Sequence, residues 1–122
     1  MSLLLTKAQR ERLLANGRRT AEGIDHDPKP VVKLFTPFAN ATWLLTELDI
    51  EIPDLAFGLC DLGVGFPELG NVMLSEIAAL RGPGGLRVER DRHWRPDGTL
   101  SQYADAAYAA GSIVDYVKGG AR

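Results

Sequence analysis

The chain has 122 residues, a formal net charge of −2, and 45% hydrophobic and 25% charged residues, values that exclude a disordered or fibrous chain. A chain of this length forms one domain with its own core, so we expect a single domain over residues 1–122, of which residues 1–3 are compatible with a cloning scar. No Lys or Arg lies between Lys33 and Arg81, so this acidic central segment is a poor candidate for touching nucleic acid, and we predict no specific nucleic-acid partner.

The first predicted element is a helix over residues 6–16. Thr6 is a suitable N-cap, Gln9 stands at the capping-box position, and Gly17 after Asn16 is typical of a helix stop. The stretch that follows, "GRRTAEGIDHDPKP", is rich in residues that break regular structure. We therefore expect a long loop that ends at Pro30.

Strands are predicted next. The stretches "VVKLFT" and "TWLLTEL" are dense in β-branched and aromatic residues, and "PFANA" between them supplies a turn, which indicates a hairpin. In the second strand, Trp43, Leu45 and Glu47 are expected to share one face. In the next stretch, "LAFGLCDL", small residues alternate along one face, which suggests that a helix packs there.

A short fourth strand, "GNVMLS", leads into a helix with Ser75 as the expected N-cap and Gly82 as the stop. The stretch "GLRVERD" indicates a fifth strand at an edge, because its alternate arginines discourage further pairing. Ser101 is the expected cap of a last helix, in which apolar residues recur every three or four positions and which Gly111 is expected to kink or end.

Consecutive strands with short connections pair antiparallel, because a parallel neighbour needs a long crossover. We therefore expect an α+β fold: a single small domain with a mainly antiparallel sheet of four to five strands and helices packed on one face. The lone cysteine, Cys60, indicates a reducing compartment, and the three leucines near the start are too few for a signal peptide or a membrane span. We expect a cytoplasmic protein without membrane contact.

The stretch "FGLCDLGVGFPELG", residues 57–70, is the most unusual part of the chain. Its glycines do not lead directly into a helix and no lysine follows at the required offset, so neither kind of phosphate loop fits and no cofactor is predicted. Gly63 and Gly65 are expected to adopt positive φ in a turn between two strands. Asp61 and Glu68 flank that turn.

Carboxylates could converge with a histidine as metal ligands or as acid and base groups. Glu47, Asp61 and Glu68 are candidates together with His26 or His93, but no spacing typical of a metal site is present, so no metal is predicted. These residues are also typical of solvated strand ends and turns. We favour that second interpretation.

The stretch "VERDRHWRP" places Arg90, Asp91 and His93 close together. They could supply an anion clamp, an orienting carboxylate and a general base, although a surface ion-pair network is the commoner arrangement. Among the aromatic residues, only Trp94, with arginines on both sides, fits a platform for stacking on bases. Trp43 is expected in the core.

At "PVVKLFTP", "TWLLTELD", "FGLCDLGVGFPELG", "LSEIAALRG" and "VERDRHW" the chain resembles a bacterial family known as domain of unknown function 2958. The likeness runs from about Leu4 to Val117, and residues 61–70 are its most specific part. The resemblance implies a protein of plasmids and other mobile elements with no established activity. A motif centred on a loop also implies a role beyond turn formation.

The leading hypothesis is a small cytoplasmic accessory or protein-interaction module of mobile-element origin, which binds another protein through its acidic, glycine-bearing sheet edge. The alternative is a small metal-dependent hydrolase or nuclease that uses the acidic residues with His93. The alternative requires these groups to converge in one pocket, whereas a binding module needs only an exposed patch. The candidate site residues are Asp61, Gly63, Gly65, Glu68, Arg90, Asp91 and His93.

Overall fold

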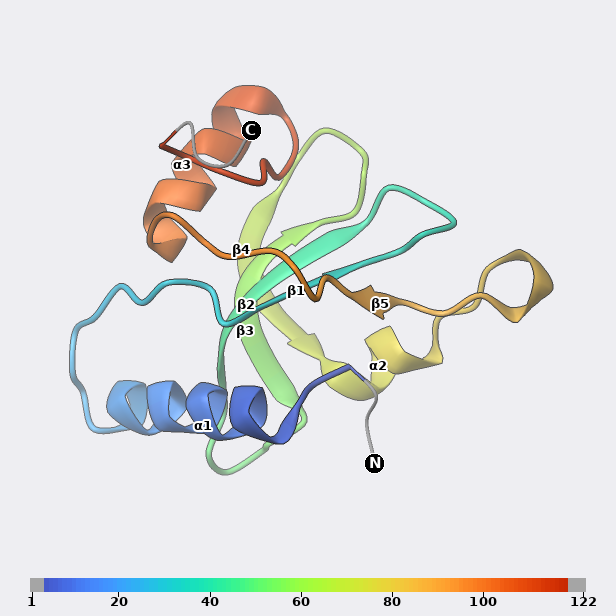
Figure 1. Cartoon of the computed structure of the whole chain (residues 1–122). Helices are drawn as coiled ribbons and strands as arrows, with labels where there is room; N and C mark the ends of the chain where they lie inside the picture. Colours follow the sequence, from blue (N-terminus) through green and yellow to red (C-terminus); the bar gives the residue numbers. More distant parts are fainter. Residues whose placement is uncertain (1–3, 119–122) are drawn as a thin grey trace.

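The computed structural model describes residues 4–118, and the interpretation of residues 1–3 as a cloning scar falls outside this range. Helices and strands alternate irregularly along the chain (Figure 1). Their bounds, in chain order, are α1 (Lys7–Ala21), β1 (Val32–Phe35), β2 (Thr42–Leu48), β3 (Leu55–Asp61), β4 (Glu68–Met73), α2 (Leu74–Ala79), a 3-10 turn (Pro83–Gly85), β5 (Glu89–Arg90) and α3 (Leu100–Ala110). None of the helices formed by residues 4–118 has the length and apolar character that a membrane span requires.

The five strands form one sheet in the order β4-β3-β2-β1-β5, and every neighbouring pair is antiparallel. The α+β class and the antiparallel sheet of the sequence prediction are therefore confirmed. Three hairpins build the β1–β4 part because the connections between these strands are short. Strand β5 lies at one edge, as expected, but is only two residues long.

A bulge in β2 changes which residues share a face. Leu45 pairs with Gly58, but Glu47 already pairs with Phe57, so Thr46 is the extra residue. Trp43 and Leu45 do lie in one hydrophobic cluster, and Leu48 joins them there instead of Glu47. The prediction that Glu47 shares their face is thus wrong, because strict alternation fails at a bulge.

Helices cover both faces of the sheet, which corrects the prediction that they pack on one face. One cluster joins Leu13 of α1 and Leu74 and Ile77 of α2 to β1 and β2. The other joins Tyr103 and neighbouring residues of α3 to Leu44 and Leu59, whose side chains point the opposite way. In Figure 1, α1 and α3 accordingly lie far apart, at the bottom and top of the view.

Helix α1 is longer than expected. Its capping box between Thr6 and Gln9 is confirmed, but the helix continues through Gly17 to Ala21. A Cβ atom at Gly17 would lie 1.8 Å from the backbone oxygen of Leu48, so the glycine allows α1 to approach β2 closely. The interpretation of Gly17 as a helix stop is therefore wrong.

The two predicted serine caps are also wrong. The N-cap of α2 is Met73, and the capping box of α3 is formed by Thr99 and Gln102. Ser75 and Ser101 lie one residue inside the helices and donate their hydroxyls to Asp54 and Asp27. These bonds fix the helix starts to distant loops, which local sequence cannot reveal. Gly111 ends α3 in the left-handed conformation, with φ 78°.

Candidate functional site

The β3–β4 loop is held at its base by Asp61. This carboxylate is only 3% exposed; its Oδ1 accepts the Gly63 N–H at 2.8 Å and its Oδ2 accepts the Ile113 N–H at 2.9 Å. Gly63 and Gly65 have φ of 81° and 91°, which confirms the expected turn conformation. Asp61 therefore acts as a clamp between the loop and the segment after α3.

The tip of this loop is apolar and points into solvent. Leu62, Val64 and Phe66 are 65%, 69% and 78% exposed. Large apolar side chains clustered on the surface mark interaction sites, whereas single ones are ordinary. The sequence gives one indication of this surface, because three apolar residues alternate with glycines in a predicted turn. It does not show whether another element of the fold covers these side chains.

A hollow of about 560 Å³ lies between the β1–β2 loop, the base of the β3–β4 loop and the segment that follows α3. It brings together four of the predicted site residues, which are Asp61, Gly63, Gly65 and Asp91. Lys33 lies there too, with its side chain 13% exposed, and forms an ion pair with Asp91 at 3.5 Å and a hydrogen bond to Asp115. This lysine ties β1 to two other segments.

Both carboxylates in this hollow already have structural partners. Asp91 Oδ1 accepts the backbone N–H groups of His93 and Trp94, each at 3.1 Å. Burial alone would raise the pKa of Asp91, but these bonds and the charge of Lys33 outweigh it and leave the pKa below its usual value. Asp91 is thus ionised at neutral pH and cannot serve as a general acid.

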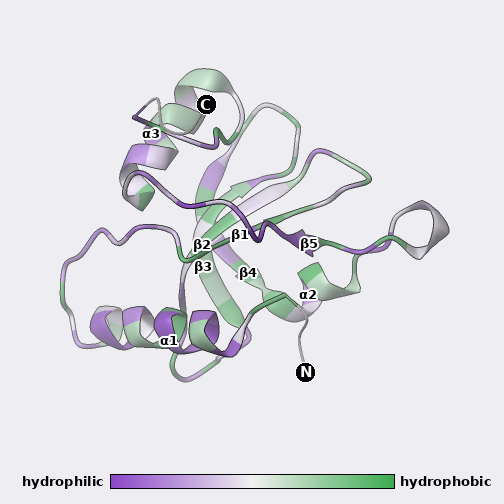
Figure 2. Ribbon diagram, in the orientation of Figure 1, coloured by the Kyte–Doolittle hydropathy of each residue, from purple (hydrophilic) through white to green (hydrophobic). Residues whose placement is uncertain are grey.

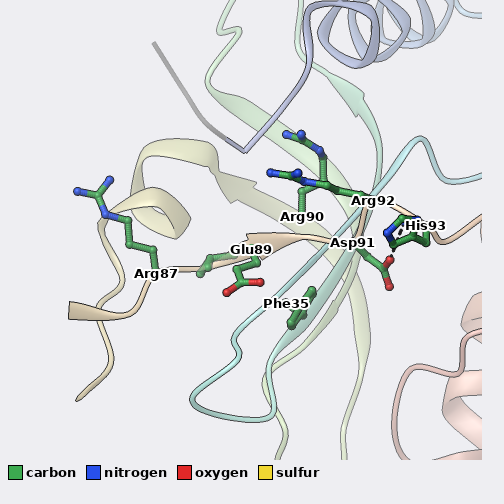
Figure 3. A pocket seen from close by; sticks show the side chains of 8 residues that line it. Phe35, Arg87, Glu89, Arg90, Asp91, Arg92 and His93 are labelled. Atoms are coloured by element: carbon green, nitrogen blue, oxygen red, sulfur yellow. Dashed lines mark hydrogen bonds between the residues drawn. The ribbon is translucent and has the colours of Figure 1, made fainter. Parts of the chain in front are cut away.

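Arg90 and His93 line a second hollow, of about 540 Å³, which shares Asp91 with the first. Figure 3 shows His93 beside Asp91, but the hydrogen bond between them uses the backbone N–H of His93. The side chains of Arg90 and Arg92 extend from the backbone on the side away from Asp91 and His93 (Figure 3). The arrangement is not an oriented carboxylate–imidazole pair of the kind that acid–base catalysis needs.

The remaining candidate, Glu68, is exposed at the start of β4 and lines a third hollow with Phe66, Leu69 and Tyr108. Asp61, Glu68 and His93 therefore line three different hollows. Within residues 4–118, no group of three His, Cys, Asp or Glu side chains is placed to hold a metal ion. The structure gives no support to the hydrolase or nuclease alternative.

Trp94 is not a stacking platform, which corrects that interpretation. The indole is 7% exposed, packs edge-on against Tyr103 with ring centroids 5.8 Å apart, and donates its Nε1–H to the Asp115 carbonyl at 2.8 Å. The ring is therefore part of the core on the α3 side and is not exposed for stacking on bases. Trp43, 3% exposed, is a core residue as expected.

Comparison with known families matches the model described as "Protein of unknown function (DUF2958)" to residues 4–114. The match includes β1 to β5, α1, α2 and α3, and with them all the predicted site residues. No curated protein and no solved structure matches the chain.

Proposed function

The chain belongs to the DUF2958 family of proteins of unknown function, and from that premise we propose that it is a small accessory protein that binds an extended segment of another protein along β4. The observation that carries this proposal is the exposed apolar tip of the β3–β4 loop, which lies directly before an edge strand. An edge strand leaves backbone N–H and C=O groups for pairing with a further strand.

In the part of the chain that the structure describes, strand β4 has a neighbouring strand on one side only. It pairs with β3 from Leu55↔Met73 to Cys60↔Glu68 and stands last in the strand order. Leu69 on β4 is 41% exposed, and Tyr108 of α3 is 52% exposed. These two side chains, Phe66 and Pro67 line the hollow of about 420 Å³ at the start of the strand. We call Phe66, Leu69 and Tyr108 the apolar edge surface.

Charge indicates the chemistry of the partner. Glu68 lines the same hollow, and Asp105 is exposed one helical turn before Tyr108 on α3. No Lys or Arg occurs between Lys33 and Arg81, so β2, β3 and β4 contain no positive side chain. We infer that the partner segment alternates apolar with basic residues. A second copy of this chain would bring Glu68 of each copy near the same acidic surface, which disfavours self-association.

The setting in this proposal is the cytoplasm, with the protein serving a mobile element. Cys60 is half-buried against the core, and burial raises the pKa of its thiol, which is the state of an unreactive cysteine in a reducing compartment. The mobile-element origin rests on the family resemblance alone.

Defined peptides test the proposed docking. A peptide of about nine residues that alternates Lys and Val has the length of a strand; we expect it to bind, and we expect Glu–Val and Pro-interrupted versions not to bind. Phe66→Ser and Glu68→Lys should weaken binding, whereas Leu86→Ser, at an exposed apolar position outside this surface, should not. Equal binding of the acidic peptide would contradict the proposal.

Photo-crosslinking in cells identifies the natural partner. A crosslinker placed at Phe66 should give a discrete adduct that the same group at Ile24, in the α1–β1 connection, does not give. Mass spectrometry of the adduct then reads the captured segment, which we expect to be basic and apolar. An adduct only with a second copy of this chain would show that the edge is a dimer interface instead.

A further inference from the structure

A groove of different chemistry is lined by none of the residues of the β3–β4 loop, β4 or α3. It has a volume of about 790 Å³ and lies between α1, the α1–β1 connection and the segment after β5. It is lined by one cation from each of these three segments, which are Arg12, Lys29 and Arg95, and none of the described residues that line it is Asp or Glu. We call this feature the basic groove.

The three cations are available for a ligand. All are exposed, and within residues 4–118 none forms an ion pair with a carboxylate; Arg95 donates only to the Trp94 carbonyl, at 3.3 Å. Figure 2 shows much of α1 and the segment between β5 and α3 in hydrophilic colours. Both basic flanks of the sequence contribute to this groove, Arg12 and Lys29 from the first flank and Arg95 from the second.

The walls of the groove are rigid. Pro28, Pro30 and Pro96 line it together with the cations. The connection that carries Lys29 is fixed on both sides, because the Pro28 carbonyl accepts the Leu100 N–H at 2.9 Å and Val31 donates its N–H to Leu45 at 2.8 Å. Binding therefore costs little ordering of the chain, and the prolines offer apolar contact between the charges.

The basic character continues beyond the groove along the chain. In Figure 3, the side chain of Arg92 extends toward the segment that leads into α1, away from Asp91 and His93. Arg92 is exposed and lies three residues before Arg95 in the chain. Several cations that come from three separate segments match the repeated phosphates of a nucleic-acid backbone.

We propose that the basic groove binds the phosphate backbone of a single-stranded nucleic acid without reading its bases. Among residues 4–118, no aromatic side chain lines the groove, so bases have no stacking partner there. A duplex presents its phosphates on a broad convex surface, which three cations inside a recess contact poorly. A flexible single strand can turn its phosphates into the recess.

Fluorescence anisotropy tests this inference with a labelled oligo-dT of about 12 nucleotides, a length near the site size of single-strand binders. Contacts to three phosphates predict a slope of about −2 in log affinity against log salt, and so about a 20-fold loss between about 50 and 200 mM salt. The variant Arg12→Gln, Lys29→Gln, Arg95→Gln should bind at least 10-fold more weakly and show a flatter salt dependence.

A matched variant separates the groove from overall charge. Arg18→Gln, Arg87→Gln, Lys118→Gln also removes three positive charges, at exposed positions outside the groove, and should bind within about twofold of the parent chain. Circular dichroism confirms that both variants are folded. Equal weakening in the two variants, or no binding at low salt, would overturn the proposal.

Two competitors separate the sources of phosphate. Unlabelled oligo-dT should displace the probe, whereas tripolyphosphate at the same ionic strength and a duplex of the same length should displace it far less. Stronger displacement by tripolyphosphate would show that the groove takes a small oligophosphate, and stronger displacement by the duplex would show a double-strand site; either result contradicts the single-strand proposal.

Discussion

Asp61 on β3 and Ile113 after α3 are 52 residues apart in the chain, yet the Asp61 carboxylate accepts the Ile113 backbone N–H at 2.9 Å. The other oxygen of the same carboxylate accepts the Gly63 N–H. One buried side chain thus fixes the start of the exposed loop and the segment after α3. The base of the loop that carries Phe66 is preorganised, which would lower the entropic cost of the binding proposed there.

Replacing Asp61 should destabilise the fold although the shape of the side chain is retained. In Asp61→Asn, an NH2 group faces one of the two backbone N–H donors, so a buried donor loses its acceptor. We expect a loss of about 1–3 kcal/mol in the free energy of unfolding, measured by urea denaturation. Glu68→Gln, at an exposed position, should change it by less than about 0.5 kcal/mol. Equal effects would show that Asp61 is not a clamp.

The two loop glycines should respond differently to alanine. Both have positive φ, so each substitution strains the backbone by about 1 kcal/mol. At Gly63 the new Cβ would also lie 2.8 Å from the Asn40 Cβ, whereas at Gly65 no atom lies within 4 Å. Gly63→Ala should therefore be the more destabilising of the two in urea titrations. The reverse order would be inconsistent with the close packing between the two hairpin loops.

The parts of the fold that the sequence predicts are those decided by neighbours along the chain. The β1–β2 hairpin, the positive φ at Gly63 and the end of α3 at Gly111 all depend on residues a few positions away. The role of Gly17 does not, because it is set by the Leu48 carbonyl on another element. The same holds for the placement of α3 on the second face, which depends on Leu44 and Leu59.

In the candidate site, too, features that depend on nearby residues can be predicted from the sequence, whereas exposed surfaces cannot. The sequence identifies Asp61, Gly63 and Gly65 as unusual and the sheet edge as acidic, and the structure places all three around one hollow. The exposure of Phe66 and the recess between Arg12, Lys29 and Arg95 depend on which surfaces remain uncovered after folding. Periodicity and spacing carry no information on this point.

Core and surface apolar residues should separate clearly in stability measurements. Leu45 is fully buried and packs in the cluster with Trp43, so Leu45→Ala should cost about 2–5 kcal/mol. Phe66 is 78% exposed, so Phe66→Ser should change stability by less than about 0.5 kcal/mol while it weakens peptide binding. A large loss of stability in Phe66→Ser would mean that the loop tip packs on the domain and is not an interaction surface.

Acid stability should depend on Asp91. Because the pKa of this carboxyl is lower in the folded chain than its unfolded value of about 3.9, its ionised form favours the folded state. This contribution is fully present above the unfolded pKa and is lost as pH falls through the folded pKa. In Asp91→Asn the contribution is absent at every pH, so the stability of this variant should fall less steeply than that of the parent chain below about pH 4.

Urea denaturation of both chains from about pH 7 to pH 2 measures this difference in stability. The control is Glu89→Gln, at an exposed position of β5. Parallel curves for Asp91→Asn and the parent chain would show that the bonds to His93, Trp94 and Lys33 contribute nothing to folding.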